Sequence, residues 1–425
     1  MNIIKEILSK PLFKVISLNG ISILIKIFVG FITSKFIAIF VGPSGLALVG
    51  NLRNFLTTTE AFASLGFENG VVKYVAEHQS EEQQLKKTIS TIFITVLFAC
   101  LAISLGLFFL SDYLNNTVFG AKYNYGFIFK SLAVALPFYI GNIFLIATIN
   151  GFGAYKKVIY INIIGSLIGL LASVLLIWKL NTEGALLSII VTPSVLFLVS
   201  FVAINQELKI VRLINLSSYN LSFLKNLSSY SLMALVSAVF GPLVFLAIRK
   251  NIILTLGLEQ AGFWEAMTRI SSYYFMFITS LIAIYYLPKL AIAKDKTETK
   301  ALFWNYFKGI LPLFTIGMIV LYFLRNLVIQ FVFSEEFLPV SKLFFWQLLG
   351  DVFKAAAFIL GYQFYAKKLT KAFIVSELFS LFVLYFSSIY LVAQFSIEGV
   401  VMAHAFTYFI YFITLCIYFR KSLFA

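Results

Sequence analysis

The sequence predicts an all-α integral membrane protein. Of the 425 residues, 61% are hydrophobic and only 12% are charged, whereas soluble domains contain about 25% charged residues. Apolar stretches of about 20 residues, the length that crosses a bilayer, recur from end to end. Lipid cannot satisfy backbone polar groups, so spanning segments are helices or closed barrels, and uninterrupted apolar runs favour helices.

The apolar windows between polar breaks predict about twelve spanning helices. The first six are expected at residues 12–40, 44–72, 84–112, 123–151, 157–179 and 183–204. The second six are expected at residues 223–252, 259–287, 299–325, 337–366, 369–393 and 397–420. We therefore expect two six-helix lobes, residues 1–204 and 223–425, joined by a polar cytoplasmic linker at residues 205–222.

The distribution of basic residues predicts the orientation. If the N-terminus is cytoplasmic, most Lys and Arg residues fall in cytoplasmic loops, and the opposite side keeps only Lys122, Lys130, Lys179, Arg249, Lys250 and Arg325. This is the asymmetry of the positive-inside rule, and it places both termini in the cytoplasm. The formal net charge of +15 therefore reflects membrane topology, and we expect no nucleic-acid partner.

Three sequence matches indicate an internal repeat. "GFGAYKK" from Gly151 parallels "GYQFYAKK" from Gly361, "TEGALL" around Glu183 parallels "IEGVVM" around Glu398, and "VFGAKY" from Val118 parallels "VFSEEF" from Val332. All three pairs are about 210 to 215 residues apart, which indicates duplication. Six helices per copy keep both copies in the same orientation, with a site expected between them near the midplane.

The cysteine and histidine residues point to neither a metal site nor a cofactor. Cys100 and Cys416 both lie in apolar runs, without a CxxC motif or a Cys/His cluster. His404, in the last predicted helix, has the chemistry of a proton relay. A lone mid-helix histidine is more often a packing residue, and we assign His404 to packing.

Charged residues inside the predicted spans are the candidate functional residues. A charge at the centre of a spanning helix costs about 2.5–3.5 kcal/mol on insertion scales, so such residues usually face a cavity or a partner. The candidates are Lys26, Arg53, Glu60, Arg249, Glu265, Arg269, Asp351 and Lys354.

Helical spacing relates several of these candidates. Arg53 and Glu60, seven residues apart, return to nearly the same helix face. Glu265 with Arg269, and Asp351 with Lys354, have spacings that allow pairing on one face, and both pairs could also be neutralised packing devices. Arg249 lies near the outer end of its predicted helix, where it could border a cavity or lie among lipid headgroups.

The basic candidates have the chemistry of an anion site. Guanidinium groups bind phosphate oxygens bidentately, and an ammonium adds a point charge. We expect Arg53, Lys26, Arg269 and Arg249 to bind a phosphate or pyrophosphate. The other four charged candidates, Glu60, Glu265, Asp351 and Lys354, would balance this charge or carry a coupling ion.

The chain resembles the bacterial oligosaccharide-lipid flippases, in particular the Wzx-type O-antigen translocases and the lipid III flippases of enterobacterial common antigen synthesis. The resemblance runs over nearly the whole length. It is carried by "LIKIFVGFITSKFIAIFVGPSGLALVGNLRNF" from Leu24, "NGVVKYVAEH" from Asn69, "QQLKK" from Gln83, "LAIRK" from Leu246 and "FWQLLGDVFKAAAFILGY" from Phe345.

The resemblance implies the superfamily of multidrug, oligosaccharidyl-lipid and polysaccharide exporters, with two six-helix lobes around a central cavity. It implies a flippase that moves an undecaprenyl-diphosphate-linked glycan across the bacterial inner membrane by alternating access. It also implies glycan polymerase or ligase partners, besides membrane lipid, and we expect a monomer. Glu265 and Arg269 lie outside the matching positions, so their assignment rests on their charge alone.

Two other functions are compatible with such a chain. A multidrug extruder of the same superfamily would need an anionic, aromatic cavity for organic cations, and the basic candidates argue against one. A membrane glycan polymerase would need a large periplasmic loop with catalytic groups, and no outer gap is much longer than about fifteen residues. We therefore expect a transporter and not an enzyme.

Overall fold

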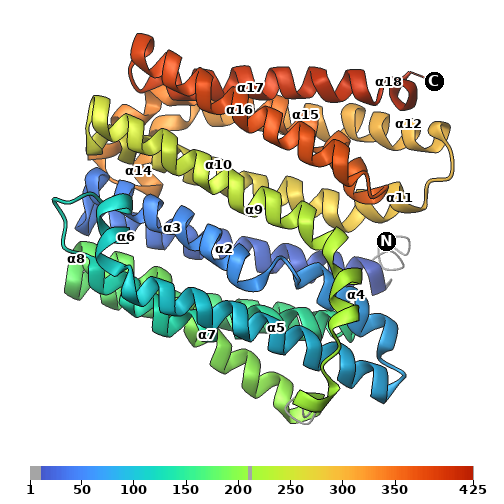
Figure 1. The fold of residues 1–425 in the computed structure, drawn as a ribbon. Helices are drawn as coiled ribbons and strands as arrows, with labels where there is room; N and C mark the ends of the chain where they lie inside the picture. Colours follow the sequence, from blue (N-terminus) through green and yellow to red (C-terminus); the bar gives the residue numbers. More distant parts are fainter. Residues whose placement is uncertain (1–10, 209–212, 425) are drawn as a thin grey trace, which may run out of the picture. The chain divides into compact units, whose positions relative to one another are not determined.

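The computed structural model describes residues 11–208 and 213–424, which form helices and contain no strand (Figure 1). Ten of the helical segments are long and apolar enough to cross a membrane. One of these, Tyr155–Ile204, has 50 residues and is broken by a non-helical residue, so it corresponds to two spans. The all-α membrane fold predicted from composition is confirmed.

By packing, the chain divides into two compact units. The first is Met1–Phe36 with Asn51–Pro242, and the second is Ile37–Gly50 with Leu243–Ala425. The boundaries fall inside helices α2 (Pro11–Phe40), α3 (Gly42–Ser64) and α9 (Leu221–Leu256), so each of these helices contributes to both units. The lobe boundaries expected from the sequence stay a prediction, and residues 209–212 of the expected linker lie outside the described residues.

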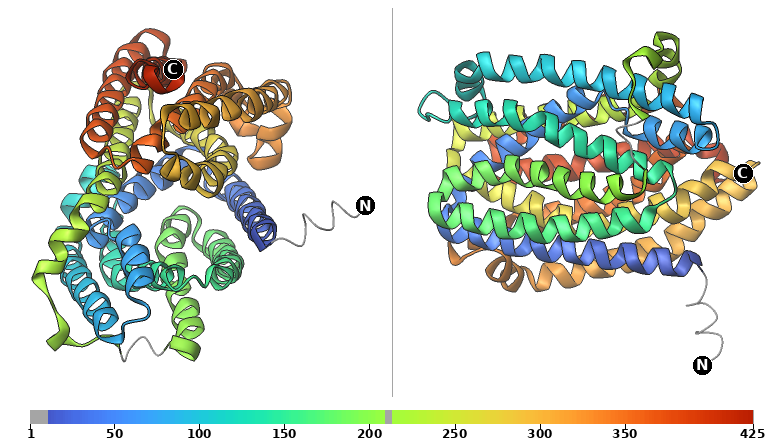
Figure 2. Two further views of the ribbon diagram at one scale, coloured as in Figure 1. Left: turned by 90° about the vertical axis from the view of Figure 1, so that its right-hand side faces the viewer. Right: turned by 90° about the horizontal axis from the view of Figure 1, so that it is seen from below.

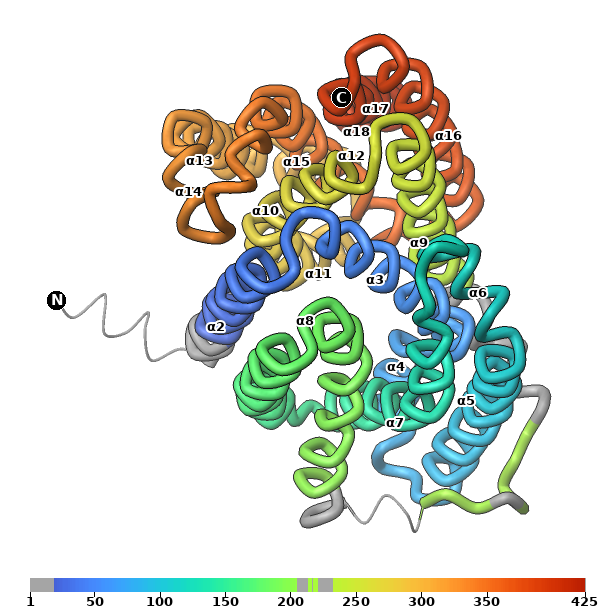
Figure 3. The backbone as a smooth tube through the Cα atoms, turned by 90° about the vertical axis from the view of Figure 1, so that its left-hand side faces the viewer, coloured from blue at the N-terminus to red at the C-terminus, as the bar shows by residue number. Residues whose placement is uncertain are grey.

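The first unit is organised around helix α7. This helix packs against α4, α5, α6 and α8, and α4 also packs against α5 (Figures 1 and 3). The bounds of the helices in this unit, besides its parts of α3 and α9, are α2 (Pro11–Phe40), whose last four residues belong to the second unit, α4 (Glu68–His78), α5 (Glu82–Phe109), α6 (Ser111–Val118), α7 (Gly126–Gly151) and α8 (Tyr155–Leu208).

Helix α8 is a hairpin of two antiparallel segments. It turns at Asn181, whose φ of 46° and ψ of −119° are not helical. The hydroxyls of Ser173 and Thr192 lie 3.4 Å apart across the segments, and the missing side chain of Gly165 lets Leu196 pack against the helix backbone. Small residues of this kind allow close approach of membrane helices. The expected helices at 157–179 and 183–204 are both present, with the break between them.

The second unit is organised around α15 and α17, which pack together, and α16 packs alongside α17 (Figure 2). Helix α10 contacts α15 and the 3₁₀ segment η5. The elements of this unit, besides its parts of α2, α3 and α9, are α10 (Leu258–Leu281), η3 (Ile282–Tyr286), α11 (Leu287–Ile292), α12 (Lys296–Asn305), η4 (Tyr306–Ile310), α13 (Leu311–Phe323), α14 (Arg325–Val332), η5 (Glu335–Leu343), α15 (Phe344–Ala366), α16 (Thr370–Phe395), α17 (Glu398–Tyr418) and α18 (Arg420–Leu423).

The internal repeat is visible in the turns of the two units. Asn181 and Ser396 both have positive φ, at 46° and 54°. In each case a glycine follows three residues later, Gly184 or Gly399, and a Cβ there would lie 1.9 Å or 2.1 Å from a leucine carbonyl oxygen of the preceding helical segment. Only glycine allows this approach, which explains why the repeated strings share a glycine at this position.

A second pair of elements supports the same duplication. Helices α6 and α14 each have eight residues, and each ends at a valine that is followed by phenylalanine, at Val118 and Val332. Neither short helix was expected from the sequence as a separate element. These equivalent elements recur in both halves of the sequence, as duplication predicts, and the parallel orientation of the two copies stays a prediction.

Two expected helices are shorter in the structure than the apolar windows indicated. The helix expected at 44–72 ends at Ser64, because Leu65 and Gly66 have φ values of 53° and 63°, and α4 begins afresh at Glu68. The helix expected at 337–366 starts as the 3₁₀ segment η5, which contains Pro339, and becomes α-helical at Phe344. Local backbone geometry overrides hydropathy at both positions.

The contact between α10 and the start of α3 allows a stability test. A Cβ at Gly262 would lie 1.9 Å from the carbonyl oxygen of Pro43, whereas a Cβ at Gly317 would have nothing within 4 Å. Overpacking typically costs about 1–3 kcal/mol. We expect Gly262→Ala to lower the melting temperature of the purified protein, since about 1 kcal/mol corresponds to roughly 2–4 °C in a chain of about 150–250 residues and to a smaller shift in a longer one.

The matched control is Gly317→Ala in helix α13. Alanine has a higher helix propensity than glycine by about 1 kcal/mol, so this variant should melt at or above the wild-type temperature. Equal melting temperatures for the two variants would contradict the close approach at Gly262.

Candidate functional site

The candidate charges divide between the two units. Lys26 on α2 and Arg53 and Glu60 on α3 belong to the first unit. The second unit holds those on α9, α10 and α15, namely Arg249, Glu265, Arg269, Asp351 and Lys354. The structure joins several of these into buried networks and leaves others at accessible positions.

In the first unit, Glu60 is held by a hydrogen bond from another helix. The Tyr139 hydroxyl on α7 donates to Glu60 Oε2 at 2.5 Å, and Glu60 is half-buried. Arg53 is exposed on the same helix, and Lys26 is half-buried. Lys26 has no hydrogen-bond or ion-pair partner in the part of the chain that the structure describes. The unit therefore carries accessible cationic groups together with one anchored carboxylate.

Helix α3 differs from its neighbours in polarity. It has 23 residues, long enough to span, yet it is not among the segments apolar enough to do so. Its sequence, GPSGLALVGNLRNFLTTTEAFAS, carries Asn, Arg, Thr and Glu side chains. A helix of this kind within a membrane protein faces protein or water and not lipid. This polarity makes α3 the strongest candidate for lining a polar transport path.

In the second unit, one carboxylate binds two arginines. Glu265 Oε2 accepts from Arg249 Nη2 at 2.6 Å, and Glu265 Oε1 accepts from Arg269 Nε at 3.0 Å. All three side chains are buried, at 1%, 5% and 3% exposed for Arg249, Glu265 and Arg269. The expected pairing of Glu265 with Arg269 is present, and Arg249 joins it from α9 instead of lying among headgroups.

This triad is enclosed by tight packing. The guanidinium of Arg249 lies 5.2 Å from the ring centroid of Trp264, and Trp264 stacks on Phe245 at 5.4 Å. A Cβ at Gly50 would lie 2.4 Å from Glu265 Oε2, so α3 approaches the carboxylate with bare backbone. Formally, two positive charges and one negative charge leave the triad with one positive charge. Such a charge is tolerable only because each ion has a partner.

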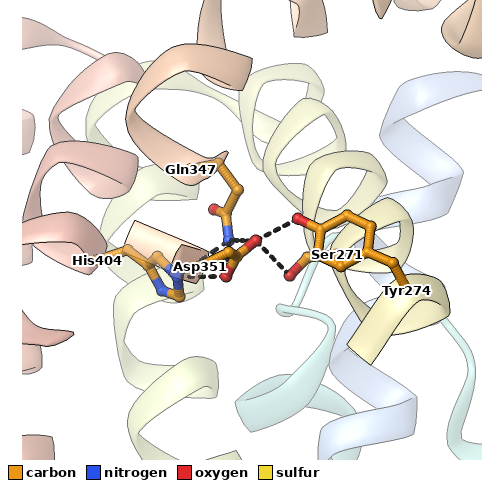
Figure 4. Close-up of polar contacts among 5 residues, drawn as sticks. All are labelled: Ser271, Tyr274, Gln347, Asp351 and His404. Carbon is orange, nitrogen blue, oxygen red and sulfur yellow. Dashed lines mark hydrogen bonds and ion pairs between the residues drawn. The ribbon is translucent and has the colours of Figure 1, made fainter. Parts of the chain in front are cut away.

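A second buried network surrounds Asp351 (Figure 4). Asp351 is 0% exposed. Its Oδ1 lies 2.8 Å from His404 Nε2, and its Oδ2 accepts hydrogen bonds from Ser271 Oγ at 2.8 Å and from the Tyr274 hydroxyl. Gln347 Nε2 lies 3.2 and 3.3 Å from the two carboxylate oxygens. Helices α10, α15 and α17 all contribute to satisfying this one carboxylate.

Asp351 and Lys354, whose spacing allows pairing, form no direct ion pair in the described part of the chain, although their charges interact electrostatically. The Oδ1 of Asp351 contacts His404 Nε2 directly at 2.8 Å, a contact that is an ion pair when the imidazole is protonated. Lys354 Nζ instead lies over aromatic rings, at 4.6 Å from the centroid of Phe275, 5.2 Å from Tyr408 and 5.7 Å from Phe358. Spacing on one helix could not reveal this, because the competing partner comes from a helix far along the chain.

His404 is a buried histidine with hydrogen-bonding partners, as expected of a packing residue, and its role as a proton relay stays an untested alternative. It is buried against α15, where Gly350 has no side chain, and a Cβ there would lie 2.5 Å from His404 Cδ2. The available signal was a histidine inside an apolar helix in a chain that also buries an aspartate. The sequence does not show that α15 and α17 pack together. That packing brings His404 next to Asp351.

A cavity of about 130 Å³ lies beside both networks in the second unit. Its lining includes Ser271, Gln347 and His404 from the Asp351 network and Trp264 from the packing around the triad, together with Lys354. The side-chain Oε1 of Gln347 is buried without a hydrogen-bond partner, which usually costs about 1–3 kcal/mol. The cavity thus combines polar groups, aromatic rings and one lysine.

The triad predicts an asymmetric response to mutation. Replacing Glu265 by Gln should destabilise the protein by about 3–5 kcal/mol, because two buried guanidiniums lose their counter-charge. Glu259→Gln, at an exposed position in the first turn of the same helix, should change stability by no more than about 0.5 kcal/mol. Unfolding in detergent measures both.

A double variant tests whether the three charges act together. Arg249→Met combined with Glu265→Gln should destabilise less than the sum of the two single changes, because the charges share one network. Strictly additive losses would show that the triad is not an energetic unit.

Comparison with solved structures shows what fold this chain is similar to. An inward-facing multidrug resistance MATE family transporter of the MOP superfamily aligns with a TM-score of 0.80 at 13% identity, covering 93% of this chain and 94% of that one. The lipid II flippase MurJ, in an inward closed conformation, aligns with a TM-score of 0.71 at 15% identity, covering 96% of this chain and 87% of that one. Both share the fold.

Sequence comparison is more specific. The lipid III flippase of Escherichia coli strain K12 is 29% identical over 395 residues, which cover 93% of this chain and 95% of that protein, and the lipid III flippase of Shigella flexneri matches equally. Residues 12–291 match the family described as "Polysaccharide biosynthesis protein". Because this match covers well over half of the sequence, the chain belongs to the polysaccharide biosynthesis protein family.

Proposed function

We propose that this protein is a flippase that moves a lipid-linked oligosaccharide across a bacterial cytoplasmic membrane by alternating access. The observation that carries the proposal is the likeness to the lipid III flippases over 93% of the chain. The fold, which is also that of multidrug transporters and of a lipid II flippase, is compatible with this function. In this proposal the protein transports and catalyses no reaction.

The proposed substrate is an undecaprenyl-diphosphate-linked glycan that moves from the cytoplasmic to the periplasmic leaflet. Its saccharide would follow the polar helix α3, while the prenyl chain stays in lipid. Exposed Arg53 and half-buried Lys26 supply cations for the pyrophosphate. Arg249 and Arg269 bind Glu265 directly, so we propose that they act through the single positive charge of the triad and not by free guanidinium forks.

The membrane potential can supply the driving force. A pyrophosphate diester carries about two negative charges, and one charge gains about 2.3 kcal/mol per 100 mV. An inside-negative potential therefore favours outward movement of the substrate by about 4.6 kcal/mol per 100 mV. The protein would act as a monomer in the inner membrane and pass its substrate to glycan polymerase or ligase machinery.

A multidrug extruder is the alternative that the fold leaves open. An organic cation would need an anionic binding surface, because like charges repel. Of the accessible charged candidates, Arg53, Lys26 and Lys354 are cationic, and the one half-buried carboxylate, Glu60, accepts a hydrogen bond from the Tyr139 hydroxyl. The charge of the candidate sites therefore favours an anionic substrate over a cationic drug.

Transport by an Arg53 variant tests the proposed function. Wild-type protein in proteoliposomes should translocate a fluorescent undecaprenyl-diphosphate saccharide, faster under an inside-negative potential. Arg53→Ala should reduce the rate at least tenfold, because a hydrogen bond to a charged group is worth about 1.5–3 kcal/mol. Lys26→Ala should also reduce it.

Arg325→Ala is the matched control for a lost arginine. Arg325 donates to the Tyr322 carbonyl oxygen at 2.8 Å and lies over the Tyr322 ring, so its loss should leave the rate near that of wild type. Export of a cationic dye, with no movement of any lipid-linked saccharide, would replace the flippase by the drug extruder.

Glu60 is the proposed coupling group of the first unit, with Asp351 as a buried carboxylate in the second. If Glu60 carries a coupling ion, Glu60→Gln should lose stimulation by a proton or sodium gradient and keep stimulation by the membrane potential. Tyr139→Phe, which removes only the hydrogen-bond donor, should retain gradient stimulation. Undiminished gradient stimulation in Glu60→Gln would exclude the coupling role.

A further inference from the structure

A wide apolar cavity lies between helices α5, α7 and α8 of the first unit. It measures about 340 Å³, more than twice the volume of the cavity beside the Asp351 network. Phe93 and Phe144 line it from α5 and α7, with ring centroids 5.5 Å apart. Phe197 and Phe201 line it from α8 and stack at 5.8 Å. None of the charged candidates lines this cavity.

Two features of the sequence shape the cavity. A Cβ at Gly141 would lie 2.8 Å from a ring carbon of Phe197, so this ring packs directly on the backbone of α7. Pro193 lies inside α8, four residues before Phe197, and lacks the N–H that would continue the helical hydrogen bonds. The last part of α8 then runs away from α7 toward the linker (Figures 1 and 3). The space beyond Phe197 therefore follows from the sequence of α8.

The linker after α8 fixes one end of the cavity. Ile214 lines the cavity, and both of its neighbours are held on α5. The Ser90 hydroxyl donates to the Leu213 carbonyl oxygen at 3.0 Å and accepts from the Asn215 N–H at 2.9 Å. The distribution of basic residues assigns this linker to the cytoplasmic side. The cavity therefore lies at the depth of the cytoplasmic leaflet.

The cavity accepts hydrocarbon and not a polar solute. The residues that line it are apolar or glycine. A polar ligand would lose its hydrogen bonds to water there without replacing them, which is costly. Phe93, Phe197 and Phe201 are only half-buried, so the cavity is open to the surroundings of the unit. In a membrane these surroundings are lipid chains.

The size of the cavity favours a branched chain. A cavity of about 150 Å³ holds one benzene molecule, so 340 Å³ holds about ten to twelve carbon atoms, or about two isoprene units. A polyprenyl chain carries a methyl branch and a double bond in each unit and is wider than a straight acyl chain. Aromatic walls contact these branches by dispersion. A straight chain would leave part of the volume empty and lose such contacts.

Basic side chains lie where the phosphate of such a lipid would be. Lys86 comes seven residues before Phe93, on nearly the same face of α5 and about 10 Å closer to the cytoplasmic end. It pairs with Glu82 at 2.6 Å and keeps a side chain that is 38% exposed, and Lys87 follows it. An ammonium group attracts phosphate oxygens. The cavity and this basic end of α5 therefore complement a hydrocarbon chain that is joined to an anionic headgroup.

We propose that this cavity binds the first two isoprene units of the substrate's polyprenyl chain, with the diphosphate at the basic end of α5. The site loads the substrate from the cytoplasmic leaflet before its headgroup enters the transport path, and the rest of the chain stays in lipid. The inference rests on the proposed flippase function and adds a site for the lipid part of the substrate.

Photolabelling tests the site on wild-type protein without requiring transport. The probe is a saccharide linked through diphosphate to a polyprenyl chain with a photoreactive diazirine in its second isoprene unit. The protein is held in nanodiscs of phosphatidylethanolamine and phosphatidylglycerol. Labelled peptides should contain Phe93, Phe144 or Phe197. Excess undecaprenyl phosphate should prevent the labelling, and the same excess of phosphatidylglycerol should not.

A matched pair of variants locates the site. Ile214→Trp places a large ring at the end of the cavity and should weaken probe binding about tenfold, because the loss of about two buried CH₂ groups is enough for this factor. Leu198→Trp is the control. Leu198 lies on α8 beside Phe197, but it is 59% exposed and outside the lining, so this variant should bind the probe like wild type.

Two results would overturn the site. A phosphatidylglycerol that carries the diazirine in its acyl chain could label the same peptides and be displaced no better by undecaprenyl phosphate than by phospholipid. The cavity would then hold ordinary membrane lipid. Labelling outside α5, α7 and α8, or labelling that Ile214→Trp leaves unchanged, would also reject it.

Transport in proteoliposomes separates this site from the proposed function. Translocation of the saccharide lipid without labelling of the cavity would reject the site and leave the flippase function standing. Labelling as expected, without translocation of any saccharide lipid, would support the site and reject the flippase function.

Discussion

The bond of Glu265 to two arginines is the interaction on which the second unit depends. A charge buried in a membrane protein must have a partner, because neither lipid nor a dry interior solvates it. This requirement fixes the neighbours: Gly50 must lack a side chain next to the carboxylate, and Gly262 must allow the Pro43 backbone close to α10. The buried charge of Glu265, the two glycines and the course of α3 in this unit therefore depend on one another.

The same rule separates structural charges from functional ones. Asp351 has several hydrogen-bonding partners on three helices and is fully buried, so it organises the packing of α10, α15 and α17. Lys354, three residues later, lies over aromatic rings and lines a cavity, and the charges of Asp351 and Glu377 act on it without a direct ion pair in the described part of the chain. Two charges that look alike as a sequence pair therefore have different roles. Asp351 joins three helices through hydrogen bonds, whereas Lys354 packs over aromatic rings at the cavity wall.

Duplication accounts for the features that the two halves share. The residues to which we assign the proposed function are among those in which the halves differ. Both copies keep the positive-φ turn with its tightly packed glycine, and both keep a short helix that ends in Val-Phe. These features serve backbone geometry, which any copy of the fold requires. The ionisable side chains are not repeated in this way: the buried triad and the Asp351 network lie in the second unit, and the polar part of α3 with Arg53 and Glu60 lies in the first.

The sequence by itself determined the fold class, the approximate spans, the repeat and the set of intramembrane charges, because hydropathy and spacing are properties of single segments. It also gave the pairing of Glu265 with Arg269, since both lie on one helix. Only the tertiary structure decided that Arg249 joins this pair and that His404 displaces Lys354 as the partner of Asp351. These contacts join residues on different helices, and which helices meet depends on packing over the whole chain.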